Sequence, residues 1–150
     1  MGYVYAEIDL TSEDDLVLAR HGILPDHAIK TVKVRALVDS GAWDLTISEE
    51  IQKQLDLPLV GKDFVRLADE TLLEVELAGP VQVRFENQTT LVATAVVLPG
   101  TSEVLLGAYP MEGLDVFIDP KGEKLLVNPQ GPDNPKSKIR YYRREVSASV

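Results

Sequence analysis

The chain has 150 residues, of which 45% are hydrophobic, and its formal net charge is -9. This length fits one domain with a core of its own, and the negative charge argues against a nucleic-acid partner, which requires a basic face. The absence of cysteine excludes a disulfide framework, a thiolate metal site and a cysteine nucleophile.

No apolar run is long enough to cross a bilayer, and the first ten residues lack the basic and then apolar plan of a secretion signal. We therefore expect a soluble, cytoplasmic protein with no membrane partner.

The charge is unevenly distributed along the chain, because residues 130–150 carry five Lys and Arg against two Asp and Glu. We predict a folded domain over residues 1–128 and a flexible, Pro-rich, basic tail over residues 129–150.

The first segment, residues 3–10, is rich in β-formers and predicts a strand. Residues 11–15 have the composition of a turn or a helix cap. Residues 16–19 fit a helical turn or a short strand, and periodicity does not decide between them. His21 and His27 lie around the next loop without a third partner at a recognised spacing, so we assign them no metal or other role.

The segment Thr31–Val38 alternates between apolar and basic residues, which predicts a strand. One face carries Val32, Val34, Ala36 and Val38, and the other carries Lys33 and Arg35. This strand runs directly into Asp39, Ser40, Gly41 and Ala42. Such a sequence holds a carboxyl group on a turn, since glycine permits a sharp turn and a close approach of neighbours. Asp39 is therefore a candidate catalytic acid, although an isolated Asp-Ser-Gly is more often an ordinary turn.

After an extended stretch over residues 43–47, Ser48 is a good N-cap for a short helix that ends before Pro58. The remainder has a β pattern. We predict these further elements: a hairpin of residues 64–67 and 72–77 with its turn at 68–71, a second hairpin of residues 81–86 and 90–98 with its turn at Asn87-Gln88, a short strand over residues 103–107, a connector or helical turn over residues 108–114, and a third hairpin of residues 116–119 and 124–127.

Two apolar strands therefore end in glycine, one at Asp39-Ser40-Gly41-Ala42 and one at Val104-Leu105-Leu106-Gly107. Together they resemble the two signatures of the retropepsin-like family of aspartic proteases, and residues 3–128 are similar to its small single-domain prokaryotic members. The resemblance implies an all-β half-barrel with one or two short helices. It also implies an aspartic endopeptidase that acts on a peptide or protein substrate without a cofactor.

The mechanism that this resemblance implies needs two carboxyl groups that share one proton. The chain holds a single Asp-Ser-Gly, so we expect a homodimer in which each subunit contributes Asp39. The family implies that Ser40, Gly41 and Ala42 form the active-site turn and the hydrogen-bond lattice between subunits. Leu105, Leu106 and Gly107 form the second signature.

The hairpin at residues 66–74 occupies the place of the family's substrate-covering flap, but it contains no glycine. Its flap and substrate-lining candidates are Leu67, Ala68, Asp69, Glu70 and Thr71. Trp43 takes a position where many retroviral members have an acid. For this residue two interpretations stand side by side: it packs at the subunit interface or lines a substrate subsite, or it belongs to the core.

Two alternatives to a protease remain at this stage. The first is a non-catalytic dimeric module on the same fold that binds or scaffolds peptides, because a fold alone does not establish activity. The second is an unrelated small β-barrel in which the two motifs are coincidental.

Overall fold

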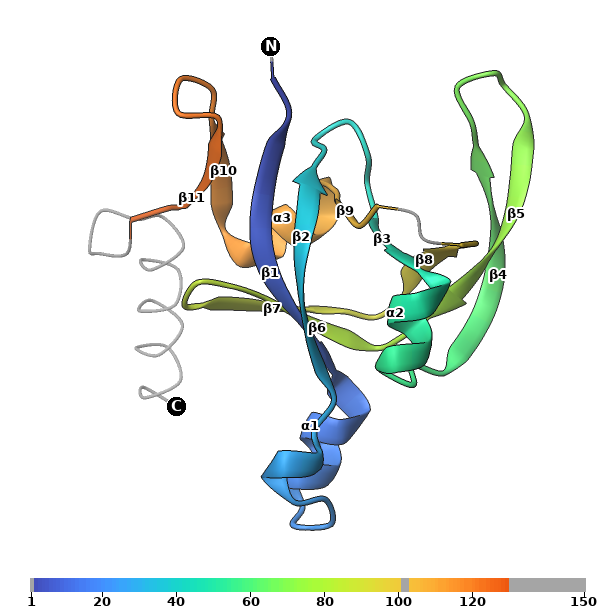
Figure 1. Cartoon of the computed structure of the whole chain (residues 1–150), viewed down its shortest axis with the longest axis vertical. Coiled ribbons are helices and arrows are strands. Elements are labelled where there is room, and N and C mark those ends of the chain that lie inside the picture. The colour runs from blue at the N-terminus through green and yellow to red at the C-terminus, as the bar shows by residue number, and fades with distance from the viewer. Residues whose placement is uncertain (1, 101–102, 130–150) are drawn as a thin grey trace, which may run out of the picture.

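The computed structural model of the chain describes residues 2–100 and 103–129. Within them, a curled nine-stranded sheet carries a separate two-stranded hairpin and three short α-helices (Figure 1). The strands of the large sheet are β1 (Val4–Ser12), β2 (Thr31–Val38), β3 (Leu45–Ser48), β4 (Leu59–Arg66), β5 (Leu72–Ala78), β6 (Val81–Phe85), β7 (Gln88–Val92), β8 (Ala95–Leu98) and β9 (Leu105–Leu106). The other elements are the hairpin β10 (Val116–Asp119) and β11 (Lys124–Val127), the helices α1 (Glu13–Arg20), α2 (Glu49–Gln54) and α3 (Ala108–Leu114), and the 3-10 turn η1 (Asp26–Ala28).

Strand β2 occupies an inner position of the sheet, whose order is β4-β5-β8-β3-β9-β2-β1-β6-β7. It pairs antiparallel with β1 along its whole length and parallel with the short strand β9 at its end. The predicted bounds and face of β2 are confirmed, since Ala36 and Val38 are buried while Lys33 and Arg35 are exposed. The end of β2 is thus held from both sides.

Serine hydroxyls begin two of the helices, as their sequence positions indicated. The Oγ of Ser12 accepts a hydrogen bond from the backbone N–H of Asp15 at 3.2 Å and starts α1, which settles residues 16–19 as helical. The Oγ of Ser48 accepts one from the N–H of Ile51 at 3.2 Å and starts α2. Both contacts satisfy an N–H group that has no partner inside the first helical turn.

The prediction of one strand over residues 90–98 is wrong. The chain bends at Ala93-Thr94, so that β7 pairs with β6 while β8 crosses to lie between β5 and β3. The turn before β7 also lies one residue earlier than predicted, at Glu86-Asn87. At the bend, the carbonyl oxygen of Ala93 packs closely on Gly79, since a Cβ added to Gly79 would lie 2.2 Å from that oxygen. The break is therefore imposed by tertiary packing, with no glycine or proline to mark it.

The other predicted strands are present with different bounds. The first runs on to Ser12, β4 begins earlier than expected, at Leu59, and the strand expected over residues 103–107 is reduced to Leu105–Leu106. The hairpin of β10 and β11 has Val116 opposite Val127. Residues 108–114 form helix α3, so three α-helices occur within the described residues where one or two were expected. The predicted tail, residues 129–150, lies outside the described residues apart from Pro129, and the division of the chain at residue 128 stays a prediction.

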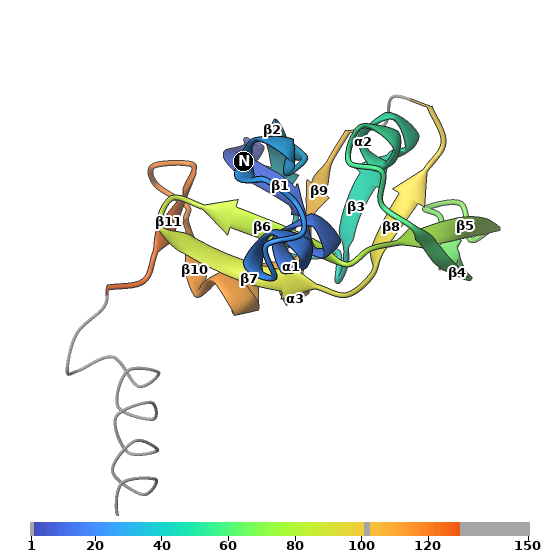
Figure 2. The same cartoon turned by 90° about the horizontal axis from the view of Figure 1, so that it is seen from below.

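The elements arrange the candidate functional segments at one end of the molecule. In Figure 1 the turn after β2 and the tip of the β4–β5 hairpin both point upward, while α1 lies at the opposite end. Figure 2 shows the same hairpin standing to one side of the sheet. Among the described residues, no helix has the length and apolar character needed to span a membrane.

An ion pair whose acidic partner is buried joins α1 to the residue before β2. The side chain of Asp15 is 9% exposed, and its Oδ2 accepts the backbone N–H of Lys30 at 2.9 Å and lies 2.8 Å from the Lys30 Nζ. Burial alone would raise the pKa of Asp15, but the hydrogen bonds and charge of Lys30 outweigh it, and the pKa is lowered. The ionised carboxylate therefore stabilises the fold above its ordinary pKa, and this contribution is lost as the pH falls through the lowered value.

We predict that Asp15→Asn lowers the free energy of unfolding by about 1–3 kcal/mol at neutral pH, because a charged hydrogen bond and its pairing are removed. Denaturant unfolding measures this loss, and the difference from the unsubstituted protein should shrink below about pH 4. The control is Asp14→Asn, whose side chain is exposed in the same helical turn and which should cost no more than a few tenths of a kcal/mol. Equal losses from both variants would contradict the role of the ion pair.

Candidate active site

Asp39 is the first residue after β2, and backbone hydrogen bonds from β9 fix its position. The N–H of Asp39 donates to the carbonyl oxygen of Leu106 at 3.0 Å, and the N–H of Leu37 donates to that of Val104 at 2.8 Å. Leu106 itself is fully buried in the core. The second signature therefore acts as the structural support of the first.

The turn that follows closes on the carboxyl group itself. The N–H of Gly41 donates to Oδ1 of Asp39 at 3.0 Å, and the N–H of Ala42 donates to the Asp39 carbonyl oxygen at 3.2 Å. The backbone of Gly41 does not lie in the left-handed region. The turn therefore does not need glycine for its backbone conformation, although the sequence had suggested that it would. A Cβ at Gly41 would instead lie 3.2 Å from Oδ1 of Asp39, and glycine keeps that approach open.

The segment after β9 pairs with the segment after Asp39. The N–H of Ala108 donates to the carbonyl oxygen of Ala42 at 2.8 Å, and that of Tyr109 donates to the carbonyl oxygen of Trp43 at 2.9 Å. Gly107 packs directly against the backbone of the segment after Asp39, because a Cβ on Gly107 would lie 2.3 Å from the carbonyl oxygen of Asp44. This contact, rather than a special backbone angle, requires glycine in the second signature.

The solvent side of the turn is open. Asp39 is partly buried, Ser40 is exposed, and within the described residues the Ser40 hydroxyl makes no hydrogen bond. Ala42 is partly buried and has no side-chain group that could donate to Asp39. One chain therefore presents one carboxyl group, one uncommitted hydroxyl and no second acid on the same turn.

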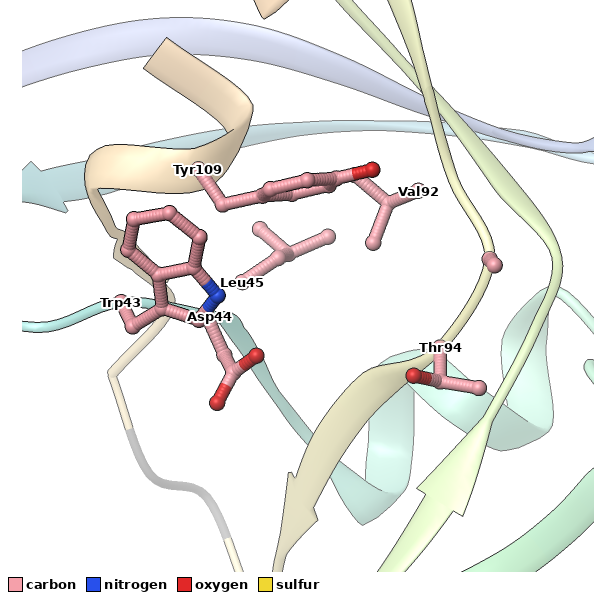
Figure 3. A pocket seen from close by; sticks show the side chains of 7 residues that line it. Trp43, Asp44, Leu45, Val92, Thr94 and Tyr109 are labelled. Carbon is pink, nitrogen blue, oxygen red and sulfur yellow. The ribbon is translucent and has the colours of Figure 1, made fainter. Parts of the chain in front are cut away.

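Trp43 is 58% exposed, so the interpretation that it belongs to the core is wrong. Its ring lies 5.6 Å from that of Tyr109 at a tilt of 52°. The two rings border a pocket of about 180 Å³ whose wall also includes Asp44, Leu45 and Thr94 (Figure 3). A concave surface thus adjoins the Asp39 turn within a single chain.

Asp44 is the charged residue of this pocket. Burial on the pocket side raises the pKa of its carboxyl group, and the negative charge of Asp63 on β4 raises it further. Among the ion pairs of the described residues, none includes Asp44. Asp44 as a whole is exposed, so only the side of its carboxylate that lines the pocket is desolvated, and no cation among the described residues compensates it.

The tip of the β4–β5 hairpin closes without glycine. The N–H of Leu67 donates to the carbonyl oxygen of Thr71 at 2.9 Å, and Glu70 takes the left-handed backbone conformation, with φ of 71°. The carboxylate of Asp69 accepts the N–H of Thr71 at 3.1 Å and also the Thr71 hydroxyl, and these bonds lower the pKa of Asp69. Ala68, inside this turn, is exposed. The hydrogen bonds that the Asp69 carboxylate accepts from Thr71 stabilise this turn in the absence of a glycine.

This tip does not meet Asp39 within one chain. The strand β4 lies five places from β2 in the sheet order, which at about 4.8 Å a strand corresponds to roughly 24 Å along the sheet. The structure therefore brings residues 39–43 together with residues 105–107 and leaves residues 67–71 at the far edge of the sheet. No group of three or more His, Asp or Glu side chains in the described part of the chain is arranged to hold a metal ion.

Tyr109 and Asp44 were not predicted as site residues. The sequence did contain a pattern that points to Tyr109, because both signatures include glycine, alanine and then an aromatic residue, at 41–43 and at 107–109. The hydrogen bonds between these two segments show that the repetition is spatial as well. Asp44 carries no such signal, since one acid among many in an acidic chain does not stand out.

A model of an aspartyl protease family matches residues 27–109, more than half of the chain. The matched region begins before β2 and ends at Tyr109, so it contains both signatures and the β4–β5 hairpin. No curated protein matches the chain. The match confirms the family resemblance of the two signatures and, with the curled sheet, the predicted half-barrel.

We predict that Gly107→Ala destabilises the protein by at least about 2 kcal/mol, since the new Cβ would collide with backbone atoms that cannot move independently. Thermal or denaturant unfolding measures the loss. The matched control is Gly61→Ala in β4, where the nearest atom to a new Cβ is Leu77 Cδ1 at 3.8 Å and where we expect little change. A Gly107→Ala protein as stable as the Gly61→Ala protein would contradict the tight packing.

Proposed function

We propose that this chain, which belongs to the aspartyl protease family, is an aspartic endopeptidase whose active form is a homodimer with one Asp39 from each subunit. The observation that carries the proposal is the position of Asp39, held by Leu106 and presented on an open turn. Within the described residues no second acid shares that turn, so the catalytic pair requires another copy of the chain.

A two-fold axis close to Asp39 supplies the missing carboxyl group without any further residue, because a symmetric contact presents the same surface twice. The exposed hydroxyl of Ser40 is available to hydrogen bond across that axis. Gly41 leaves the space beside the carboxylate open to a water molecule or a substrate backbone.

In the proposed reaction the two carboxyl groups share one proton, because two adjacent negative charges are unfavourable. The ionised carboxyl takes a proton from a water molecule, whose oxygen then attacks the carbonyl carbon of the peptide bond. The protonated carboxyl gives its proton to the carbonyl oxygen. The carboxyl that took the proton from water then gives it to the peptide nitrogen, while the other carboxylate takes a proton from a hydroxyl of the tetrahedral intermediate. The C–N bond breaks, and the pair again holds one proton.

In the dimer, the β4–β5 hairpin is the proposed cover over an extended peptide that runs from the Asp39 turns past Trp43 toward residues 67–71, a tip that does not reach Asp39 of its own chain. The same hairpin favours a second candidate function, a dimeric module that binds peptides without cleaving them. Its tip is fixed by the Asp69 contacts with Thr71 and by an ion pair of Arg66 with Glu70 at 3.1 Å, which oppose the movement of a flexible lid.

We predict that Asp39→Asn lowers the rate of hydrolysis of an unfolded, fluorescently labelled protein by at least about a thousandfold, because the amide can neither give nor take the catalytic proton. The variant should unfold at nearly the temperature of the unsubstituted protein. The control is Asp14→Asn, which changes an exposed acid at the opposite end of the molecule and should keep full activity.

Mixing the subunits tests the shared site in the same assay. After subunit exchange with an equal amount of Asp39→Asn chains, a fixed amount of unsubstituted chains should retain roughly half of its activity, since half of those chains then sit in mixed dimers. Activity that is unaffected by the added variant would contradict the dimeric site. Binding of peptide without any cleavage by the unsubstituted dimer would favour the second candidate function.

A further inference from the structure

The pocket beside Trp43 has the size of one side chain. Its volume of about 180 Å³ is below the range of about 300–1,000 Å³ that is usual for drug-sized ligands and cofactors. It also lies close to the proposed catalytic turn. Asp44 is five residues beyond Asp39 in the chain, so the two cannot be more than about 18 Å apart, which a bound peptide spans with about five residues.

The walls of the pocket combine three chemical properties. The Asp44 carboxylate lies beside the Trp43 indole, and the hydroxyl of Thr94 faces it across the space (Figure 3). Trp43 and Tyr109 are 58% and 45% exposed, so that part of each residue remains available to a ligand. These two aromatic rings also supply the apolar surface, because Leu45 at the base of the pocket is fully buried.

A long basic side chain satisfies all three properties at once. Its cationic head pairs with a carboxylate that lacks a cation among the described residues, and it interacts favourably with an aromatic ring. Its methylene stem packs on apolar surface while the head stays polar. The negative charge of Asp63, which already raises the pKa of Asp44, adds to the attraction for a cation. A neutral or acidic side chain would leave the Asp44 carboxylate uncompensated.

We propose that this pocket is a specificity subsite for an Arg or Lys side chain of the bound peptide, with Asp44 as the ion-pairing residue and Trp43 and Tyr109 as the aromatic wall. The proposal rests on the proposed function, because it takes the ligand of the pocket to be part of the peptide held at Asp39. Cleavage should therefore fall within about five residues of a basic residue.

Trp43 offers a direct test, since it is the one tryptophan of the chain and reports on the pocket through its fluorescence. The protein is the full chain with Asp39→Asn, which removes hydrolysis. The probes are acetylated hexapeptides of alanine, leucine and serine with one arginine, moved through the six positions, and a matched series with the neutral isostere citrulline.

We expect the arginine peptides, at one position or more, to change the Trp43 emission and to bind about tenfold or more tightly than their citrulline partners. Adding Asp44→Asn should abolish the difference between the two series. Adding Asp14→Asn instead should leave the difference intact. Equal binding of the two series, no response of Trp43, or an arginine preference that survives Asp44→Asn would each overturn the proposal.

Hydrolysis by the protein with Asp39 intact, measured on the same peptides, separates this inference from the proposed function. Cleavage without any preference for arginine would overturn the subsite and leave the protease. An Asp44-dependent preference in binding, without cleavage, would support the subsite and count against the protease. Thermal unfolding verifies that Asp44→Asn folds, and its stability should not fall because Asp44 is exposed and is in no ion pair among the described residues.

Discussion

The pairing of two short backbone segments is the constraint on which the candidate site depends. Asp39 is bonded to Leu106, and the two residues that follow Gly107 are bonded to Ala42 and Trp43. Gly107 has no room for a side chain, so the two segments can approach only with glycine at that position. The carboxyl group, the aromatic wall and Asp44 are all positioned by this contact, although the two segments are more than sixty residues apart in sequence.

The rest of the fold supports that contact from outside. Strand β1 pairs with β2 along its length, and the core buries Ala36 and Val38 immediately before Asp39. The ion pair of Asp15 with Lys30 fixes the other end of β2. The turn thus stands on a rigid strand, whereas the face that carries Ser40 is open to solvent, as a surface that completes itself by symmetry would be.

Local patterns predict the parts of the structure whose cause is local. The alternation in Thr31–Val38 and the cap at Ser48 were readable because side-chain period and capping chemistry act within a few residues, whereas residues 11–15 indicated only a turn or a cap. The break at Ala93-Thr94 was not readable, because it follows from the change of strand partner between β7 and β8. The parallel pairing of β2 with β9 joins distant segments, and no pattern in the sequence predicted it.

The candidate site likewise contains parts that a local pattern predicted and parts that depend on tertiary contacts. The sequence placed Asp39 on a turn after a strand, and it left two interpretations for Trp43, between which the exposure of the ring decides against the core. The pocket formed with Tyr109 and Asp44 depends on how two turns meet, and no single segment encodes it. The hairpin tip is a further case, because Glu70 adopts a conformation that glycine would take more easily, held by bonds that Asp69 makes with its neighbours.

The central claim is that two copies of Asp39 face each other, and a cross-link tests it most directly because the chain contains no cysteine. A disulfide needs Cα atoms about 4.4–6.8 Å apart, so Asp39→Cys should give a covalent dimer on mild oxidation, whereas the distant Asp14→Cys should not. Oxidation that leaves the Asp39→Cys chains uncrosslinked, or that cross-links both variants equally, would contradict the account.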